Sequence, residues 1–226
     1  MGKKANPNRT ALIVGATGLV GSELLDLLLR SDTYKQVTVL GRKPLKHNHP
    51  KLVQHVINFD ELDPYEEACA VDDVYCCLGT TIKQAGSQEA FKKVDYEYPL
   101  AIAKLAKKKG AKQFALISAI GADPHSRIFY SRVKGEIEES LKELEFPALH
   151  IYRPSLLLGK RQDFRLGERI GVITFPVLSL ILPAAFNKYK PIQAKDVAYA
   201  MYQKTLQDQR GTHIHMWKDM MDHKLL

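Results

Sequence analysis

The sequence has few cysteines: Cys69, Cys76 and Cys77 are the three in 226 residues. Cys76 and Cys77 are adjacent in an apolar run and Cys69 stands alone, which fits neither a disulfide framework nor the paired spacing of a zinc site. A small scaffold held together by disulfides or by zinc is therefore excluded. The three cysteines are expected to be small residues of the core.

The sequence also lacks a signal peptide and a membrane span. Residues 1–9 are polar and basic without an apolar core, so we expect a cytoplasmic protein. An uncharged stretch, Ile170–Phe186, is interrupted by Pro176 and Pro183 and barely reaches the minimum length that crosses a bilayer. We expect this stretch to line a substrate pocket or to form an apolar partner surface.

Neither a metal site nor a nucleic-acid surface is indicated. His213 and His215 share one face of an expected strand, but no third ligand accompanies them, so an ordinary surface pair is expected. The net charge is +8, yet no basic run is interleaved with stacking aromatic residues. Lys107–Lys109 closes an expected helix, where cations meet the negative end of the dipole. The excess positive charge predicts a solvated face, and it would also suit an anionic cofactor.

What the sequence does contain is a glycine-rich turn between an apolar strand and a helix. Leu12–Val14 is typical of a buried strand, and Leu19–Leu29 is typical of the helix after it. Between them, Gly15 permits a tight turn, Gly18 leaves room for a pyrophosphate, and Gly21 lets the helix lie close to the strand. The positive end of the helix then faces the phosphates, which predicts a dinucleotide site. The expected contacts in this turn are Gly15, Thr17, Gly18, Leu19, Val20 and Gly21.

The rest of the chain alternates between strand-like and helix-like segments. Further strands are expected at residues 36–40, 52–57, 74–78, 114–117 and 149–152, with helices at 88–109, 129–144 and 197–206. This alternation predicts an α/β fold, a doubly wound parallel sheet of the Rossmann type, because each parallel crossover needs a returning helix. We expect residues 1–226 to form one domain, to which residues 154–226 contribute a small substrate-side region. Asp196 is expected to cap the last of these helices.

Ligands of such sheets bind at the carboxyl ends of the strands. After the second strand, Gly41, Arg42 and Lys43 stand where NAD-preferring proteins carry an acid for the ribose hydroxyl. Gly41 leaves space for a phosphate, and the guanidinium of Arg42 can pair with it, which favours NADP(H). An exposed arginine at a strand end without a ligand is the alternative.

The next two strand ends offer weaker candidates. Asp60 and Leu62 could lie against the adenine, with the acid accepting from the exocyclic amine, or this segment could simply cap a helix. In the loop after the fourth strand, Gly79 and the hydroxyls of Thr80 and Thr81 could contact the ribose or phosphate of a cofactor. A simple turn without a ligand is an equal alternative for this loop. The residues of that loop are Leu78, Gly79, Thr80 and Thr81.

The fifth strand end supplies candidate catalytic residues. Ser118 ends the strand, and Tyr130 and Lys134 stand four residues apart on one face of the next helix. A phenol can donate its proton to a carbonyl oxygen, and a nearby ammonium favours the phenolate that results. We therefore expect Tyr130 as the acid, Lys134 as its partner and a contact of the nicotinamide ribose, and Ser118 as the group that orients the carbonyl.

These motifs resemble those of the short-chain dehydrogenases/reductases, in the extended and atypical branches. The matching segments are Gly15–Gly21, Tyr130–Lys134, Tyr152–Ser155 and Pro191–Ala198, in type and in order. Residues 76–81, 133–136 and 161–168 are similar to the atypical group of Tat-interacting-protein-like oxidoreductases. The resemblance implies NADP(H) at the glycine turn and the Ser/Tyr/Lys set at the cleft. Arg153, at the end of the sixth strand beside the cleft, is expected to contact the cofactor.

The chain departs from the family pattern at one position. Extended members often carry two adjacent hydroxyl residues at the end of the fifth strand and use the second, whereas Ala119 follows Ser118 here. If Ala119 occupies the working position, Ser126 or Thr81 would have to orient the carbonyl.

Two functions follow from these observations. The first is an NADPH-dependent oxidoreductase that acts on a small carbonyl compound by hydride transfer. The alternative is an NADP(H)-binding regulatory or scaffold protein with little turnover, a role that some similar proteins have. Epimerase or dehydratase chemistry on a nucleotide sugar is a third reading, against which the short C-terminal region argues. A homodimer or a protein partner is left open by the sequence.

Overall fold

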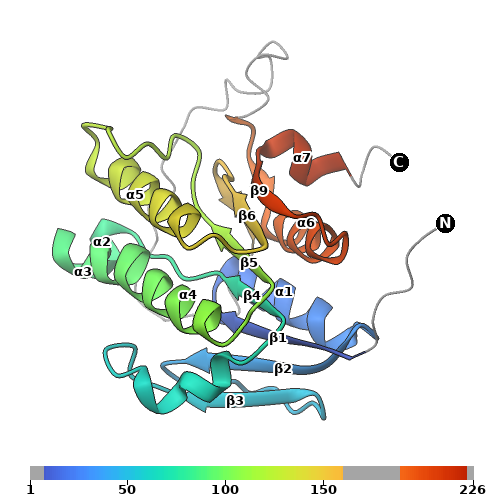
Figure 1. The fold of residues 1–226 in the computed structure, drawn as a ribbon. Coiled ribbons are helices and arrows are strands. Elements are labelled where there is room, and N and C mark those ends of the chain that lie inside the picture. Colours follow the sequence, from blue (N-terminus) through green and yellow to red (C-terminus); the bar gives the residue numbers. More distant parts are fainter. Residues whose placement is uncertain (1–7, 160–188, 223–226) are drawn as a thin grey trace.

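The computed structural model describes residues 8–159 and 189–222, and its centre is a seven-stranded parallel sheet (Figure 1). The strand order is β3-β2-β1-β4-β5-β6-β9, and every neighbouring pair is parallel. The predicted doubly wound sheet is confirmed. The strands are β1 (Arg9–Val14), β2 (Tyr34–Gly41), β3 (Leu52–Val56), β4 (Asp73–Cys76), β5 (Gln113–Ile117), β6 (Ala148–Tyr152) and β9 (Gly211–His215).

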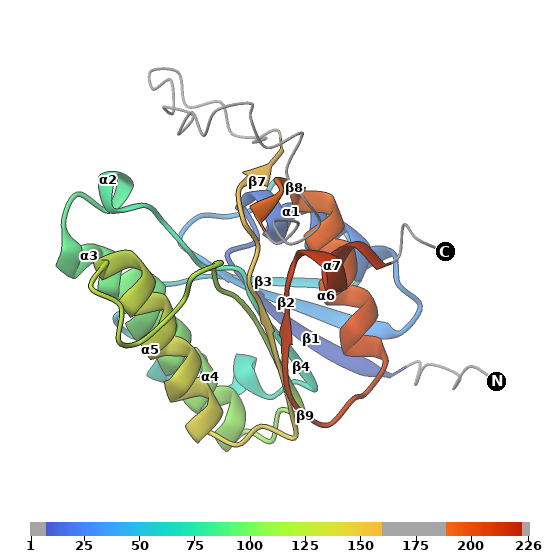
Figure 2. The ribbon, with the colours of Figure 1, turned by 90° about the horizontal axis from the view of Figure 1, so that it is seen from above.

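Helices cover both faces of the sheet, so the described part of the chain has three layers (Figure 2). On one face lie α1 (Leu19–Arg30) and α6 (Ala194–Leu206), and on the other α4 (Tyr98–Lys108) and α5 (Phe129–Glu143). The shorter elements are η1 (Asp63–Cys69), α2 (Ile82–Ala85), α3 (Gln88–Lys92), η2 (Lys93–Glu97), β7 (Leu157–Leu158), β8 (Ile192–Gln193) and α7 (Trp217–Met221).

Each face of the sheet has its own apolar core, because side chains of a strand alternate between the two faces. Ile13 of β1 packs with Leu28 of α1 in one core, and Leu12 packs with Ile102 of α4 and Ile137 of α5 in the other. All five side chains are fully buried, and each burial stabilises the fold by roughly 1.5 to 3 kcal/mol. The cysteines are free: Cys69 and Cys76 are buried, and Cys77 packs against the first core.

The helix predicted for residues 88–109 is present over residues 88–108, but it is not a regular α-helix throughout. The structure has α3, then the wide π-helical turn η2, then α4, and the Tyr98 N–H binds the Lys93 carbonyl. Pro99 explains the break, because proline has no N–H to donate to the carbonyl of Asp95, so regular α-helical bonding cannot pass this point. The extra residue in the turn places Asp95 on the inner side of the helix, where it is 1% exposed.

The C-terminal part corrects two further expectations. Helix α6 begins at Ala194 rather than near 197, and its N-cap residue is Gln193, whereas Asp196 lies buried in its first turn. His213 and His215 do lie on a strand, β9, but His215 is 6% exposed and its Nε2 lies 3.0 Å from Nδ1 of His150 on β6. The surface pair is therefore wrong for His215, because β9 pairs with β6 and brings it beside a buried histidine.

Some predictions about the C-terminal region are not tested. In the described part of residues 154–226, α6, β9 and α7 complete the sheet and one of its helical layers. The single domain with a substrate-side region stays a prediction. The apolar stretch Ile170–Phe186 lies outside the described residues.

Candidate functional site

The glycine turn after β1 is tight, and side chains would not fit at two of its three glycines. Gly15 has a φ of +80°, and a Cβ there would lie 2.4 Å from the carbonyl oxygen of Cys77 at the end of β4. A Cβ at Gly21 would lie 2.1 Å from the Gly15 carbonyl oxygen. The turn closes with a 3.0 Å hydrogen bond from the Gly18 N–H to the Gly15 carbonyl. The residues of the turn therefore form a compact cradle that presents backbone, as a pyrophosphate site requires.

Helix α1 begins immediately after this cradle. Its N-cap, Gly18, offers no side-chain cap, so the N–H groups of the first turn are left for another acceptor. Thr17 is exposed at the turn, whereas Val20 is 4% exposed and belongs to the core. Leu19 packs partly against the same core. Leu19 and Val20 can thus offer a ligand mainly their backbone, and Thr17 its hydroxyl.

Arg42 and Lys43 extend from the end of β2 into solvent. Both are exposed, and neither forms an ion pair with any residue that the structure describes. A Cβ at Gly41 would meet its nearest neighbour, the Lys43 carbonyl oxygen, at an ordinary 3.5 Å. No neighbouring atom of the chain excludes a side chain at Gly41, so the glycine leaves open space beside Arg42.

Asp60 after β3 is held by two groups from the helical region opposite. Lys93 Nζ lies 2.8 Å from its carboxylate, and the Tyr98 hydroxyl donates to it at 3.0 Å. The hydrogen bonds from Lys93 and Tyr98 lower the pKa of Asp60. Leu62, not Asp60, occupies the cap position of η1, and its side chain belongs to the core. The adenine contact of Asp60 and Leu62 stays a prediction.

The loop after β4 is partly committed to internal contacts. Gly79 is exposed and Leu78 half-buried, while the Thr80 N–H donates to Asp95 Oδ2 at 2.9 Å. The Thr81 hydroxyl caps α2 by accepting from the Gln84 N–H at 3.1 Å. The exposed Gly79 backbone and the Thr81 hydroxyl, which only accepts in this contact and keeps its proton to donate, therefore stay open to a ligand.

Tyr130 and Lys134 lie in the first turns of α5, as predicted. Tyr130 is half-buried, with its ring centroid 5.5 Å from that of Phe91. The Lys134 side chain is 5% exposed, and its Nζ lies 2.7 Å from Asp95 Oδ1 in an ion-pair contact rather than a well-formed hydrogen bond. Burial, the largest single influence, lowers the pKa of Lys134, but Asp95 foremost, together with Tyr130 and Cys76, outweighs it, and the pKa is raised.

The start of α5 is fixed against the loop that follows β5. A Cβ at Gly135 would lie 2.1 Å from the backbone nitrogen of Pro124, so the helix and the loop are in direct backbone contact. The Asp123 N–H also donates to the Ser131 carbonyl at 3.1 Å. This contact holds the face that carries Tyr130 and Lys134 in a constant place relative to the end of β5.

Ser118 is engaged by a residue that the sequence analysis did not single out. Its hydroxyl donates to Glu138 Oε1, and the same carboxylate accepts from Arg153 Nε at 3.0 and 3.1 Å. The Glu138 side chain is 1% exposed, and its hydrogen bonds raise the pKa of Arg153. The carbonyl-orienting role of Ser118 and the cofactor contact of Arg153 stay predictions, and each must compete with Glu138. Ala119, which is buried, supplies no hydroxyl beside them.

Asp95 and Glu138 are thus the two site residues that sequence reasoning missed. Both carried a readable signal, because a lone acid on an apolar helical stripe is rarely buried without a partner. Asp95 stands four residues after Phe91, which is fully buried. Glu138 stands one turn beyond Lys134 and two beyond Tyr130, so these three side chains follow one line along α5.

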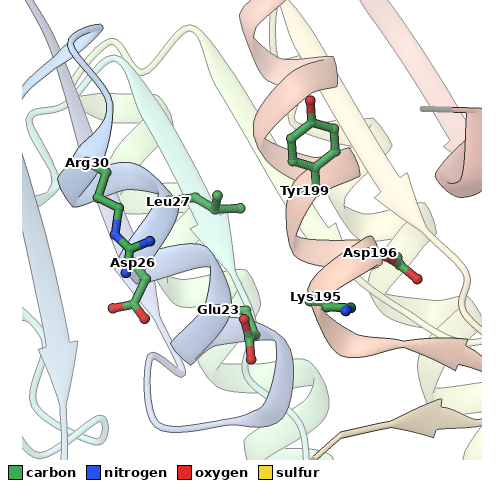
Figure 3. A pocket seen from close by; sticks show the side chains of 7 residues that line it. All are labelled: Glu23, Asp26, Leu27, Arg30, Lys195, Asp196 and Tyr199. Atoms are coloured by element: carbon green, nitrogen blue, oxygen red, sulfur yellow. The ribbon is translucent and has the colours of Figure 1, made fainter. Parts of the chain in front are cut away.

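A separate hollow of ≈ 330 Å³ lies between α1 and α6 (Figure 3). It contains none of the residues predicted to contact a cofactor or substrate. Leu27 and Tyr199 project toward it from the two helices, and the remaining side chains around it are charged. Its lining consists of Glu23, Asp26, Leu27, Arg30, Lys195, Asp196 and Tyr199.

Comparison with known proteins settles the family. Residues 11–166 match the model of the NAD dependent epimerase/dehydratase family. The chain belongs to this family. The predicted membership of the short-chain dehydrogenase/reductase superfamily is confirmed, since Protein HTATIP2 of Rattus norvegicus is 41% identical over 165 residues, covering 71% of this chain and 68% of that protein.

Solved structures agree on the fold. A UDP-N-acetylglucosamine 4-epimerase from Methanobrevibacter ruminantium M1 has a TM-score of 0.70 at 17% identity, covering 92% of this chain and 76% of that one. The Bordetella bronchiseptica enzyme WbmH, solved in complex with NAD+, has a TM-score of 0.67 at 16% identity, covering 92% and 75%. The chain therefore has the NAD-binding Rossmann-like fold of an enzyme family.

The predicted cytoplasmic location is contradicted. Protein FMP52 of Debaryomyces hansenii, 38% identical over 68% of this chain and 69% of its own length, is named mitochondrial. The relatives from Eremothecium gossypii and Scheffersomyces stipitis carry the same designation. The sequence argument failed because a polar, basic first segment argues only against a secretory signal and does not distinguish the cytoplasm from other compartments.

The described residues contain neither a metal-binding cluster nor a membrane-spanning helix. Within residues 8–159 and 189–222, no group of three or more His, Cys, Asp or Glu side chains is arranged to hold a metal ion. None of the helices in the same ranges is long and apolar enough to cross a membrane.

Proposed function

We propose that this protein is an NADPH-dependent oxidoreductase that reduces a small carbonyl compound, with Tyr130 as proton donor. The observation that carries the proposal is the placement of Lys134. Its ammonium is buried one helical turn from Tyr130, and a Cβ at Gly79, at the carboxyl end of β4, would lie 4.0 Å from Nζ. A charged group, a phenol and open backbone therefore meet where ligands of parallel sheets bind.

The residues present fit a dinucleotide. The cradle at Gly15 and Gly21 would be filled by any Cβ, and the uncapped start of α1 suits a pyrophosphate. Arg42 and Lys43 would pair with the 2′-phosphate, Asp60 and Leu62 would face the adenine, and the cofactor would supply the hydride. The other residues proposed to hold it are Thr17, Gly18, Leu19, Val20, Leu78, Gly79, Thr80, Thr81, Tyr130, Lys134 and Arg153.

The chain's own part in the reaction is a proton transfer. As hydride reaches the carbonyl carbon, the phenol of Tyr130 gives its proton to the carbonyl oxygen, so the products are an alcohol and the oxidised cofactor. The phenolate that remains takes a proton from solvent. The Lys134 ammonium stabilises that phenolate, because an adjacent positive charge favours the ionised form.

The cofactor preference is tested at Arg42. NADPH is expected to bind more tightly than NADH by about 1 to 3 kcal/mol, the contribution of charge-assisted hydrogen bonds to a phosphate. Arg42→Ala should remove most of this difference and leave NADH binding nearly unchanged, as measured by fluorescence titration. Lys35→Ala, which removes an exposed cation from the start of the same strand, is the matched control. Equal affinities for the two cofactors in the wild type would contradict the assignment.

One observation supports the second candidate, a cofactor-binding regulator. The Ser118 hydroxyl is taken by Glu138 and Ala119 has none, so the carbonyl lacks a dedicated orienting hydroxyl at the end of β5. Assay of the purified protein for NADPH oxidation with quinones, aldehydes and ketones separates the two functions. Turnover supports the reductase, whereas tight NADPH binding without turnover on any of these compounds supports the regulator.

A further inference from the structure

We propose that Asp95 is the positioning residue of this site: it holds the Lys134 ammonium in place and keeps it charged beside Tyr130. The inference deepens the proposed function, since it explains how a lysine this deeply buried can serve a phenol. The wide turn η2 directs the Asp95 side chain inward from the helical region 88–108. Wide turns of this kind occur often at functional sites in α-helices.

The carboxylate of Asp95 is itself fixed in place. Oδ2 accepts the Thr80 N–H at 2.9 Å, and this anchors it to the loop at the end of β4. Oδ1 lies 2.7 Å from Lys134 Nζ and 3.6 Å from where a Gly79 side chain would begin. Three elements, the β4 loop, η2 and α5, therefore meet at one ion pair, and the position of Nζ follows from the position of the carboxylate.

Asp95 is also the anion that balances Lys134. The other groups that act electrostatically on Nζ are Tyr130, on the same helix, and Cys76, on β4. Burial raises the pKa of the Cys76 thiol to about 12, so Cys76 carries no charge at neutral pH. Glu136 is paired with Lys92 and Arg132, and Glu138, one turn beyond Lys134 on α5, is bound by Arg153 and Ser118. Among the described residues, no second carboxylate stands ready to replace Asp95.

Loss of the Asp95 carboxylate would leave the Lys134 ammonium buried without an anion. The Lys134 side chain is 5% exposed, and a buried ammonium without a partner is driven toward its neutral form. A neutral Lys134 can neither stabilise a phenolate nor contact the cofactor as a cation. Asp95, which is 1% exposed, therefore acts through Lys134.

The first test uses no cofactor and no turnover. In Asp95→Asn the native state is expected to hold a neutral Lys134 where the unfolded chain holds a charged one. Stability should then rise with pH, and the unfolding equilibrium constant should fall by up to about tenfold per pH unit between pH 7.5 and 9.5, relative to the wild type. The wild type should lack this rise, because the raised pKa of Lys134 keeps the native ammonium charged up to its ordinary titration range.

Two further variants make the result specific. Asp95→Asn with Lys134→Met should lose the additional slope, and Asp95→Glu, which restores the charge, should behave as the wild type. Asp95→Ser, which leaves room for a water molecule, is measured in the same way if Asp95→Asn does not fold. Equal slopes for Asp95→Asn or Asp95→Ser and the wild type, from urea unfolding at each pH, would overturn the proposal.

A second readout links the pair to the cofactor. NADPH affinity of Asp95→Asn should weaken by about tenfold or more from pH 7 to pH 9, because binding as a cation must restore the proton to a neutral Lys134, while wild-type affinity stays nearly constant. A pH-independent affinity in a variant that shows the stability slope would overturn the cofactor contact of Lys134 and leave the role of Asp95 standing. A wild type that binds no NADPH would contradict the proposed function and leave the unfolding test unaffected.

Discussion

Tyr130→Phe is expected to lower turnover by about a hundredfold or more, the usual contribution of a positioned general acid. NADPH affinity should stay nearly unchanged, because the substitution removes one hydroxyl and keeps the ring that packs against Phe91. The prediction rests on the position of Tyr130, half-buried one turn before a buried ammonium. Steady-state kinetics with the best carbonyl substrate, together with an NADPH titration, measure both quantities.

A matched control is available on η2. The Tyr96 hydroxyl contacts Ser140 Oγ on α5 at 3.1 Å, so Tyr96→Phe removes a half-buried phenol that is bonded to the same helix but not predicted to act. Tyr96→Phe should keep turnover within a few-fold of the wild type. Full activity in Tyr130→Phe would end the proposed mechanism, and equal losses in both variants would indicate damage to α5 instead.

Acidification is expected to destabilise the protein through two buried histidines. Burial, followed by the positive charges around it, lowers the pKa of His150 to about 3, and burial with the charge of Lys204 lowers that of His215 to about 4. Unfolded histidine titrates near 6.5. Between these values the unfolded state binds more protons, so stability present above pH 6.5 is lost as the pH falls toward 4. From pH 7 to pH 5 each histidine should cost roughly 1.5 to 2 kcal/mol of unfolding free energy.

Asp73 acts in the opposite direction, and a substitution separates the two effects. Burial raises the pKa of Asp73 to about 6 against the pull of Arg9, so it takes up a proton in the native state over the same range. His150→Phe keeps an aromatic ring in the stack with His215 and should reduce the acid-induced loss by more than half relative to the wild type, because the contribution of Asp73 is unchanged. The control is the same substitution at exposed His125. An unchanged acid dependence in His150→Phe, from urea unfolding at pH 5 and 7, would contradict the prediction.

The fold could be predicted because its signals are local and periodic. Apolar runs such as Leu12–Val14 alternate with helical stripes, and handedness leaves few ways to connect them. The break at η2 was missed because periodicity does not register one added residue, although Pro99 is a direct indication of it. The burial of His215 could not be predicted, since it depends on the pairing of β9 with β6.

The candidate site, like the fold, could be predicted where its signals lie within one turn or one helix. The glycine turn and the Tyr130–Lys134 pair were readable because their spacing follows from one turn and one helix. For Asp95 and Glu138 the sequence shows only that each acid needs a buried partner; that the partners are Lys134 and Ser118 follows from elements that only the packed sheet brings together. A sequence pattern can place a hydroxyl at a strand end, but it does not show which neighbour accepts its proton.

Deuterium transfer tests the central claim most directly. The purified protein is incubated with NADPH deuterated at C4 of the nicotinamide and with a panel of quinones, aldehydes and ketones, and the products are examined by mass spectrometry. We expect deuterium on the carbon of the former carbonyl group of at least one aldehyde or ketone, and none with Tyr130→Phe on the same timescale. NADPH that binds at the wild-type site yet transfers no deuterium to any compound of the panel would contradict the reductase.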